Sequence, residues 1–414
     1  MTHGVICLAM HLCHSYGFLL EAFRCTDLLF LSLFPIGDFM TYQIKKVLIA
    51  AGGTGGHVFP AIAVADAMKE IQPDLEIAFV GAAHGNEANW VQKAGYRFIL
   101  LDIDFIKGAS LLRKIKNIFS LPGCARKAKK ILNEEKPDLV IGSGGYVSGP
   151  LVWVAWWKNI PTAIMEQNAI PGLTNRILSH FVNKIFISFE HTTRLPQKKL
   201  LYFGNPVRSK VLSQRTDAQP ESWNTSCNGD EMAENGLHLL VFGGSQGAQK
   251  LNTDVPLALA KLSPEQRARI SVWHQAGKNK LDATIEADKN AGITAKTTEF
   301  IDDMGAAYHW ANLLVCRAGA TSLAEIKSSA KAAILVPFPF AAHNHQEKNA
   351  DAMVQIGAAI KVLNDHVATE IPGILSQCLE SPEKIQKMAE AAFADAKPNA
   401  AHDIANYCLT TPLK

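Results

Sequence analysis

The feature that most constrains the fold is an alternation of strand, turn and helix that begins near residue 44 and recurs along the chain. Apolar runs such as KKVLIA, EIAFVG and PDLVIG alternate with helical segments such as AIAVADAMKEI. Because parallel strands need crossover connections, this order predicts parallel sheets covered by helices. A second series begins at HLLVFGG, after a polar stretch with linker composition. We therefore predict an α/β fold with two doubly wound, Rossmann-like domains facing across a cleft.

Composition narrows the class of protein. With 414 residues the chain can form two cores, and its net charge of +3 gives no reason to expect nucleic acid as a partner. The 8 cysteines form no CxxC pair, which favours a reduced, cytoplasmic protein.

The first 39 residues differ from the rest. Their apolar runs are broken by Asp27 and Pro35, are too short to span a bilayer and follow no basic segment of a secretory signal. We interpret them as an extension before a natural start at Met40, and an interfacial anchor is the alternative.

A glycine run, Gly52 to Gly56, followed by His57, lies between the first strand and a helix expected to begin at Pro60. It matches neither a Walker A loop nor a dinucleotide fingerprint, so by itself it is equally well a tight turn. His57 lies at the carboxyl end of the strand, where open α/β sheets bind ligands, and is a candidate general base. A histidine that only caps the turn is the alternative.

Two further strand ends carry small or polar residues. The turn GSGGYVSGP covers residues 142–150, and Glu166, Gln167 and Asn168 follow the strand TAIM. Three such ends in register predict a shared binding face.

The second half has two similar turns, over residues 241–248 and 316–321. Free amides at helix N-termini suit a pyrophosphate, and the Glu325 carboxylate, one helical turn further on, can accept hydrogen bonds from ribose hydroxyls. A helix-start glutamate without a ligand is the alternative. His343 and His345 resemble a metal pair, but no further ligands are spaced to join them, so we expect a site without metal and without a cofactor.

A basic segment with interleaved apolar residues runs from Lys107 to Leu132 and contains no acidic residue. This pattern is typical of a membrane surface, although a solvated basic helix would show it too. The predicted membrane patch comprises Leu112, Lys114, Ile115, Ile118, Phe119 and Trp156.

Taken together, the strings GGTGGHVFPA, GGYVSGP, EQN with GLTN, FGNPVR, GGSQGAQ, WHQAG, FIDDM, CRAGAT and HNHQEKNA resemble the MurG family from about residue 44 onward. These are GT-B glycosyltransferases of family 28 that move N-acetylglucosamine (GlcNAc) from UDP onto lipid I, an undecaprenyl-linked muramyl pentapeptide, in peptidoglycan synthesis. The resemblance implies an inverting transfer at the cytoplasmic face of the inner membrane, with UDP-GlcNAc, lipid I and an anionic membrane surface as partners. It also suggests other proteins of cell-wall synthesis and cell division as partners.

The resemblance assigns the site residues in two groups. The donor group is Thr54, Gly55, Gly56, Asn168, Arg208, Ser245, Gln246, Ile301, Ala320, Thr321, Glu325 and Gln346. The acceptor group is Gly53, Gly55, His57, Gly144, Gly145, Tyr146, Glu166 and Asn168. Within the donor group, the resemblance implies that the Ile301 backbone reads uracil, Glu325 holds ribose and Gln346 holds GlcNAc.

The chain departs from the family pattern at Met165, where a histidine is common, and at Ala318, where a serine is common. Met165 removes a polar group from the acceptor side. The predicted domains are an extension over 1–39, an acceptor and membrane-facing domain over 40–205, a UDP-GlcNAc domain over 206–393 with an insertion near 213–235, and a C-terminal helix over 394–414 that returns to the first domain.

Two alternatives remain from the residues. Another sugar-nucleotide enzyme of the same architecture, such as a UDP-sugar epimerase, would differ in acceptor specificity. A non-enzymatic nucleotide-binding or membrane scaffold would have no need of paired donor and acceptor loops.

Overall fold

The computed structural model describes residues 43–82, 86–101, 111–213, 236–244, 247–341 and 344–413, with the backbone alone over 111–122. The described residues from Ile44 onward form one compact unit. The predicted N-terminal extension lies outside the described residues, as does all but the first residue of the predicted insertion.

The first half of the compact unit contains a parallel sheet of seven strands in the order β3-β2-β1-β4-β5-β6-β7. Its strands are β1 Lys46–Ala50, β2 Glu76–Gly81, β3 Arg97–Leu100, β4 Leu139–Gly142, β5 Thr162–Glu166, β6 Lys184–Ile187 and β7 Leu200–Tyr202. Its helices are α3 Gly55–Ile71, α4 Glu87–Lys93, α5 Leu111–Glu135, α6 Ser148–Trp157, α7 Leu173–Leu178 and the 3-10 turn η1 Gln197–Lys199. Strand order reverses between β1 and β4, and ligands bind at such a switch point in open α/β sheets.

The second half contains a parallel sheet of six strands in the order β10-β9-β8-β11-β12-β13. Its strands are β8 Leu237–Phe242, β9 Ile270–Gln275, β10 Thr294–Thr298, β11 Leu313–Cys316, β12 Ala332–Leu335 and β13 Ala359–Lys361. Its helices are α8 Ser209–Ser213, α9 Gln249–Ala260, α10 Pro264–Ala268, α11 Leu281–Asn290, α12 Met304–Trp310, α13 Ala320–Ser328, α14 His345–Gln355, η3 Asn364–His366, α15 Val367–Glu380 and α16 Glu383–Ala394. Here the strand order reverses between β8 and β11.

The cores explain why the strands read as continuous apolar runs. Every residue of β4, β8, β11 and β12 is buried, because helices cover both faces of each sheet. The predicted fold class, two doubly wound α/β domains, is confirmed.

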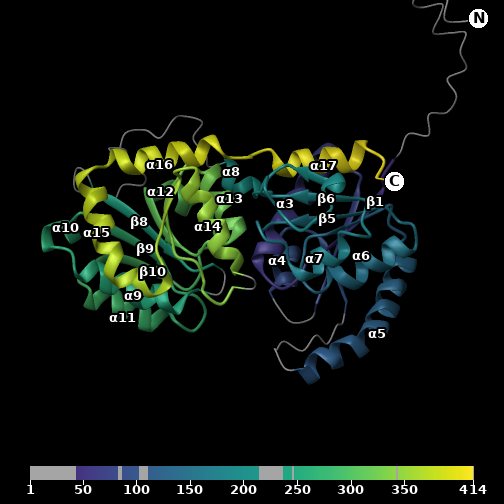
Figure 1. The fold of residues 1–414 in the computed structure, drawn as a ribbon, viewed down its shortest axis with the longest axis horizontal. Coiled ribbons are helices and arrows are strands. Elements are labelled where there is room, and N and C mark those ends of the chain that lie inside the picture. The colour runs from purple at the N-terminus through teal and green to yellow at the C-terminus, as the bar shows by residue number, and fades with distance from the viewer. Residues whose placement is uncertain are drawn as a thin grey trace, which may run out of the picture. The chain divides into compact units, whose positions relative to one another are not determined.

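The last helix, α17 (Ala400–Thr410), packs against α3 although it follows the second sheet in the chain (Figure 1). Its buried side chains recur at helical spacing and include Ile404 and Cys408. The segment that leads to α17 passes Gly204, where a Cβ would lie 2.5 Å from the Cβ of Lys397. Gly204 also has a left-handed φ of +91°, so the close passage requires glycine there.

Candidate active site

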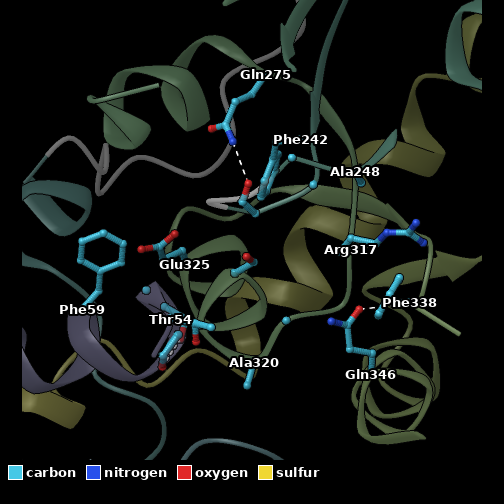
Figure 2. Close-up of a pocket in the computed structure, with 18 of the residues that line it drawn as sticks. Thr54, Phe59, Phe242, Ala248, Gln275, Arg317, Ala320, Glu325, Phe338 and Gln346 are labelled. Carbon is cyan, nitrogen blue, oxygen red and sulfur yellow. Dashed lines mark hydrogen bonds between the residues drawn. The ribbon is translucent and has the colours of Figure 1, made fainter. Parts of the chain in front are cut away.

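A cavity of about 840 Å³ is lined by residues from both halves of the compact unit and is large enough for a nucleotide sugar. It gathers eleven of the predicted site residues: Thr54, Gly55, Gly56, His57, Asn168, Arg208, Ile301, Ala320, Thr321, Glu325 and Gln346. Figure 2 shows Thr54 and Phe59 from the first half beside Glu325 and Ala320 from the second. Ser245 and Gln246 of the predicted donor group lie outside the described residues, as does His343, which was considered as a metal ligand and not adopted.

The helix after the first glycine turn begins earlier than predicted. α3 starts at Gly55, so His57 lies in its first turn and Pro60 lies inside it. The expected start at Pro60 is therefore wrong. Proline has no amide hydrogen, so the Gly56 carbonyl four residues earlier has no partner within the helix. The Thr321 hydroxyl donates to that carbonyl instead, at 3.0 Å, which explains why a proline is tolerated here.

The His57 imidazole lies against the second glycine turn. Its Nδ1 is 3.1 Å from Oε1 of Gln167. A Cβ at Gly144 would lie 2.6 Å from Nδ1, and Gly144 has a left-handed φ of +101°, so only glycine fits beside the ring. Burial lowers the pKa of His57, although hydrogen bonds with Gln167 and the Ser143 backbone oppose the shift. The ring is therefore neutral near pH 7 and can accept a proton.

Glu166 organises the loop that carries Asn168. The Glu166 carboxylate is 1% exposed and accepts hydrogen bonds from the Asn168 backbone at 2.9 Å, from the Gly172 backbone at 3.1 Å and from the Asn175 side chain at 2.9 Å. It does not line the cavity, because these contacts turn it inward under the loop. Burial raises the pKa of Glu166. Its predicted contact with the acceptor stays a prediction, and its visible task is to hold Asn168 in place.

The other predicted acceptor residues belong to the two glycine turns of the first half. Gly53 is exposed with a φ of +94°, and Tyr146 is 59% exposed. Gly145 has a φ of +79°, and a Cβ there would lie 2.5 Å from the Gly52 carbonyl, so this glycine holds the two turns together. Neither Gly53, Gly145 nor Tyr146 lines the cavity.

Two helix N-termini line the part of the cavity that belongs to the second half. Gly247, Ala248 and Gln249 lead into α9, and Gly319 precedes α13. Gly247 has a φ of +65°, and a Cβ there would lie 2.1 Å from a backbone oxygen, so the turn into α9 depends on glycine. Unpaired amides and the positive end of each helix dipole suit a diphosphate at this position.

Glu325 is 4% exposed and already has several donors. Its Oε1 accepts hydrogen bonds from Arg208 Nη2 at 2.8 Å and Nε at 3.2 Å, and its Oε2 accepts one from the Tyr308 hydroxyl at 3.0 Å. Burial raises the pKa of Tyr308 far above its usual range, so this hydroxyl keeps its proton and donates. The Arg208 guanidinium also lies 4.3 Å from the centre of the Phe59 ring, which joins the two halves.

Two glutamines shape the walls of the cavity (Figure 2). Gln346 accepts a hydrogen bond through Oε1 from the Phe338 backbone at 3.0 Å, which leaves its amide nitrogen to donate to a ligand. Gln275 donates to the Gly244 carbonyl at 2.8 Å and so holds the turn before α9. Ile301 follows β10, is 3% exposed and lines the cavity.

The predicted membrane patch is described only in part. Five of its residues belong to α5, whose side chains over 111–122 lie outside the described residues. Trp156 of α6 is 39% exposed, and the neighbouring Trp157 is 60% exposed, with the Lys129 ammonium 5.2 Å from the centre of its ring. Among the described residues, no helix combines the length and the apolar character that crossing a bilayer requires.

Several residues at the site were missed by reasoning from the sequence. Gln167 was placed at the predicted binding face with Glu166 and Asn168, but no role was assigned to it. Tyr308 and Phe59 carry no comparable signal, because a buried aromatic in a helix is normally core. Met165, a departure from the family pattern, is 2% exposed and does not line the cavity.

Comparison with known proteins gives consistent matches over both halves. The glycosyltransferase family 28 N-terminal domain matches residues 47–187, and the glycosyltransferase family 28 C-terminal domain matches residues 238–404. A relative from Anaeromyxobacter dehalogenans is 41% identical over 366 residues, which cover 88% of this chain and 92% of that protein. It is named UDP-N-acetylglucosamine--N-acetylmuramyl-(pentapeptide) pyrophosphoryl-undecaprenol N-acetylglucosamine transferase.

Solved structures agree with the sequence matches. The crystal structure of Acinetobacter baumannii MurG is 31% identical in sequence, with a TM-score of 0.69 over 87% of this chain and 98% of that one. A UDP-N-acetylglucosamine 2-epimerase has a TM-score of 0.60 over 89% of this chain and 96% of that one, but only 12% identity, so it shares the fold alone. The two Rossmann-like domains are therefore of the GT-B type.

Proposed function

Because the chain belongs to glycosyltransferase family 28, we propose that it transfers GlcNAc from UDP-GlcNAc to the C4 hydroxyl of the muramyl sugar in lipid I. The product is lipid II, the disaccharide-pentapeptide intermediate of peptidoglycan synthesis. The observation that carries the proposal is that one cavity is lined both by a neutral histidine of the first half and by two helix N-termini of the second. This arrangement suits a base on one side of the anomeric carbon and a leaving diphosphate on the other.

The donor is proposed to bind the second half. The N-termini of α9 and α13 would hold the diphosphate, the Ile301 backbone would read the uracil and the Gln346 amide would donate to GlcNAc. Thr54, Gly55 and Gly56 approach this side from the first half, because Thr321 ties α3 to the start of α13. Negative charge that develops on the leaving UDP would be stabilised by these amides and by Arg208.

The proposed ribose contact with Glu325 depends on how many of its acceptor positions are still open. A carboxylate has about four lone-pair positions, and Arg208 with Tyr308 already occupies three of them. One position on Oε2 remains for a ribose hydroxyl. A second hydroxyl can bind only if Arg208 leaves Oε1, and the released guanidinium would then be free to face the diphosphate. Donor binding is thus proposed to redirect Arg208 from Glu325 to UDP.

The acceptor is proposed to enter from the first half. The glycine turns around Gly53 and Gly144 and the Asn168 amide would receive the muramyl sugar and its diphosphate. His57 would take the C4 hydroxyl proton while the hydroxyl oxygen bonds to the anomeric carbon of GlcNAc. The bond from that carbon to the UDP oxygen breaks with its electron pair going to UDP, which inverts the configuration and gives a β-1,4 link.

A lipid-linked acceptor requires access to a membrane surface. The proposed membrane-facing surface consists of the basic segment of α5 with Trp156, at the cytoplasmic face of the inner membrane. The exposure of Trp156 and Trp157 and the cation-π contact of Lys129 support it. Binding of the full chain to vesicles with anionic headgroups should weaken as salt is raised, and equal binding to neutral vesicles would contradict this surface.

Transfer of labelled GlcNAc from its UDP donor to a soluble-chain lipid I analogue tests the proposed reaction. The full chain should form the labelled disaccharide, and the rate should persist in EDTA because amides and Arg208 supply the charge stabilisation. Loss of transfer in EDTA with recovery on adding Mg²⁺ would contradict the proposal that the reaction needs no metal ion. UDP binding without transfer would overturn the acceptor assignment, and conversion of UDP-GlcNAc to its 2-epimer would identify an epimerase instead.

A further inference from the structure

A closed set of hydrogen bonds connects His57 with two strand ends behind it. The Ser143 hydroxyl donates to the His57 carbonyl at 2.6 Å. The Gln167 amide nitrogen lies 3.0 Å from the Ser143 carbonyl and 3.2 Å from its hydroxyl oxygen, and the Gln167 oxygen lies 3.1 Å from Nδ1 of His57. Ser143 is fully buried and Gln167 is 2% exposed, so water does not compete for these bonds.

Only one assignment of hydrogens satisfies this set. A backbone carbonyl can only accept, so the Ser143 hydroxyl must donate its single hydrogen to the His57 carbonyl. The Ser143 oxygens then offer only acceptors, which requires the amide nitrogen of Gln167 to face them. Its Oε1 therefore faces His57 and, being an acceptor, requires a hydrogen on Nδ1. The carbonyls of His57 and Ser143, which can only accept, thus determine the tautomer of the His57 ring.

The consequence falls on the other nitrogen of the ring. In a neutral imidazole with a hydrogen on Nδ1, Nε2 carries a lone pair. The hydrogen-bond set described above uses Nδ1 and leaves Nε2 out. Because His57 lines the cavity, we expect the Nε2 lone pair to be available to a ligand there. His345 of α14, in the second half, lines the same cavity and lowers the pKa of His57 electrostatically.

We propose that Gln167, held in turn by Ser143, is a positioning residue that keeps His57 in the tautomer whose Nε2 takes the acceptor proton. This rests on the proposed function. As the acceptor oxygen bonds to the anomeric carbon and UDP departs with the electron pair of the broken bond, Nε2 receives the hydroxyl proton and Nδ1 keeps its own. Gln167 accepts from Nδ1–H throughout and stabilises the imidazolium that forms. In hydrolases of the Ser-His-Asp type an aspartate has this task. A neutral amide orients the ring without adding a charge that would raise the pKa of His57.

The tautomer itself is measurable without catalysis. In a protein labelled with ¹⁵N at histidine, the chemical shifts of the two His57 nitrogens show which one carries hydrogen, with the signals assigned by comparison with a His57→Gln sample. We expect hydrogen on Nδ1 above the pKa. Hydrogen on Nε2 would overturn the proposal. Absence of transfer by the wild-type protein, with hydrogen on Nδ1, would instead count against the proposed function.

Two variants test the consequence for turnover. Gln167→Met removes the acceptor with little change of volume, and we expect kcat to fall about 100-fold or more with UDP binding unchanged. Gln167→Glu keeps an acceptor but adds charge, so transfer should recover at higher pH and the acid limb of the kcat profile should move up by about one pH unit or more. Wild-type kcat and pH profile in Gln167→Met would overturn the proposal, as would an unshifted acid limb in Gln167→Glu.

Folding of these variants has its own control. Asn183→Leu removes another partly buried hydrogen bond at a strand end, the one from the Thr162 backbone at 2.9 Å, and Asn183 does not line the cavity. It should lose stability to a similar extent but keep the wild-type pH profile. If Gln167→Met does not fold, the ¹⁵N measurement and the Gln167→Glu profile still decide.

Discussion

Thr321 and Pro60 should be coupled energetically although they belong to different halves, because both determine how the Gly56 carbonyl is satisfied. Pro60 supplies no amide to this carbonyl, and the Thr321 hydroxyl donates to it at 3.0 Å. Replacing Thr321 with valine keeps the shape and leaves the carbonyl without a protein partner. Leaving a buried polar group without a hydrogen-bond partner lowers the free energy of unfolding by about 1–3 kcal/mol. Since this carbonyl is only partly buried, we expect a loss of about 1 kcal/mol.

A double-mutant cycle isolates this effect. Pro60→Ala restores an amide four residues after Gly56, so in that background Thr321→Val should cost about 1 kcal/mol less than in the wild type. The free energy of unfolding is measured for the four proteins by urea titration followed by circular dichroism. Changes at Asn205, which also contacts Thr321, cancel in the cycle. Additivity within about 0.5 kcal/mol would refute the reasoning, because it would mean that the proline does not create the need for the threonine.

Three further predictions concern the donor site, the contact between Gly204 and the C-terminal segment, and pH. Glu325→Ala should raise KM for UDP-GlcNAc about 10- to 100-fold, since charge-assisted hydrogen bonds contribute about 1.5–3 kcal/mol, while KM for the acceptor stays unchanged; equal rises would contradict the ribose role. Gly204→Ala should lower the free energy of unfolding by about 2 kcal/mol or more, because its Cβ would meet the C-terminal segment, whereas Gly292→Ala, with a φ of +65° and open space, should cost about 1 kcal/mol. Hydrogen bonds from Arg97 lower the pKa of Glu135 from 4.5 to about 2, so the stability that Glu135 adds over Glu135→Gln should be full at pH 7 and disappear as pH falls from about 4.5 toward 2; a pH-independent difference in urea midpoints would contradict this.

The proposed donor and acceptor groups share contacts, as expected of an enzyme that transfers a sugar between two bound substrates. The Arg208 guanidinium stacks on Phe59 while it binds Glu325, and the Asn168 backbone loop is tied to the second half by a hydrogen bond from the Ala169 amide to Asn349 at 3.2 Å. Groups proposed for the donor and for the acceptor therefore share contacts. A nucleotide that moved Arg208 would change the environment of α3, which carries the candidate base.

The sequence by itself determined the fold class and the location of the site. Continuous apolar strands, each followed by a glycine or polar turn and then a helix, permit little except parallel sheets with helices on both faces. Since the carboxyl ends of parallel strands meet at one edge, the turns at His57, Gly144 and Asn168 could be expected to lie together. The same reasoning located Glu325 beyond the first turn of a helix whose start lines the cavity.

The tertiary structure alone decided which of these groups reach the cavity and in what chemical state. Glu166 belongs to the predicted triplet but turns under its loop, and Gln167 beside it orients His57. α3 could begin at Gly55 because a hydroxyl 265 residues away in sequence satisfies the carbonyl that Pro60 leaves open. Local patterns report the propensity of a segment and the face that it buries. They carry no record of hydrogen-bond partners contributed by distant segments, and those partners set the start of this helix, the tautomer of its histidine and the acceptor capacity left on Glu325.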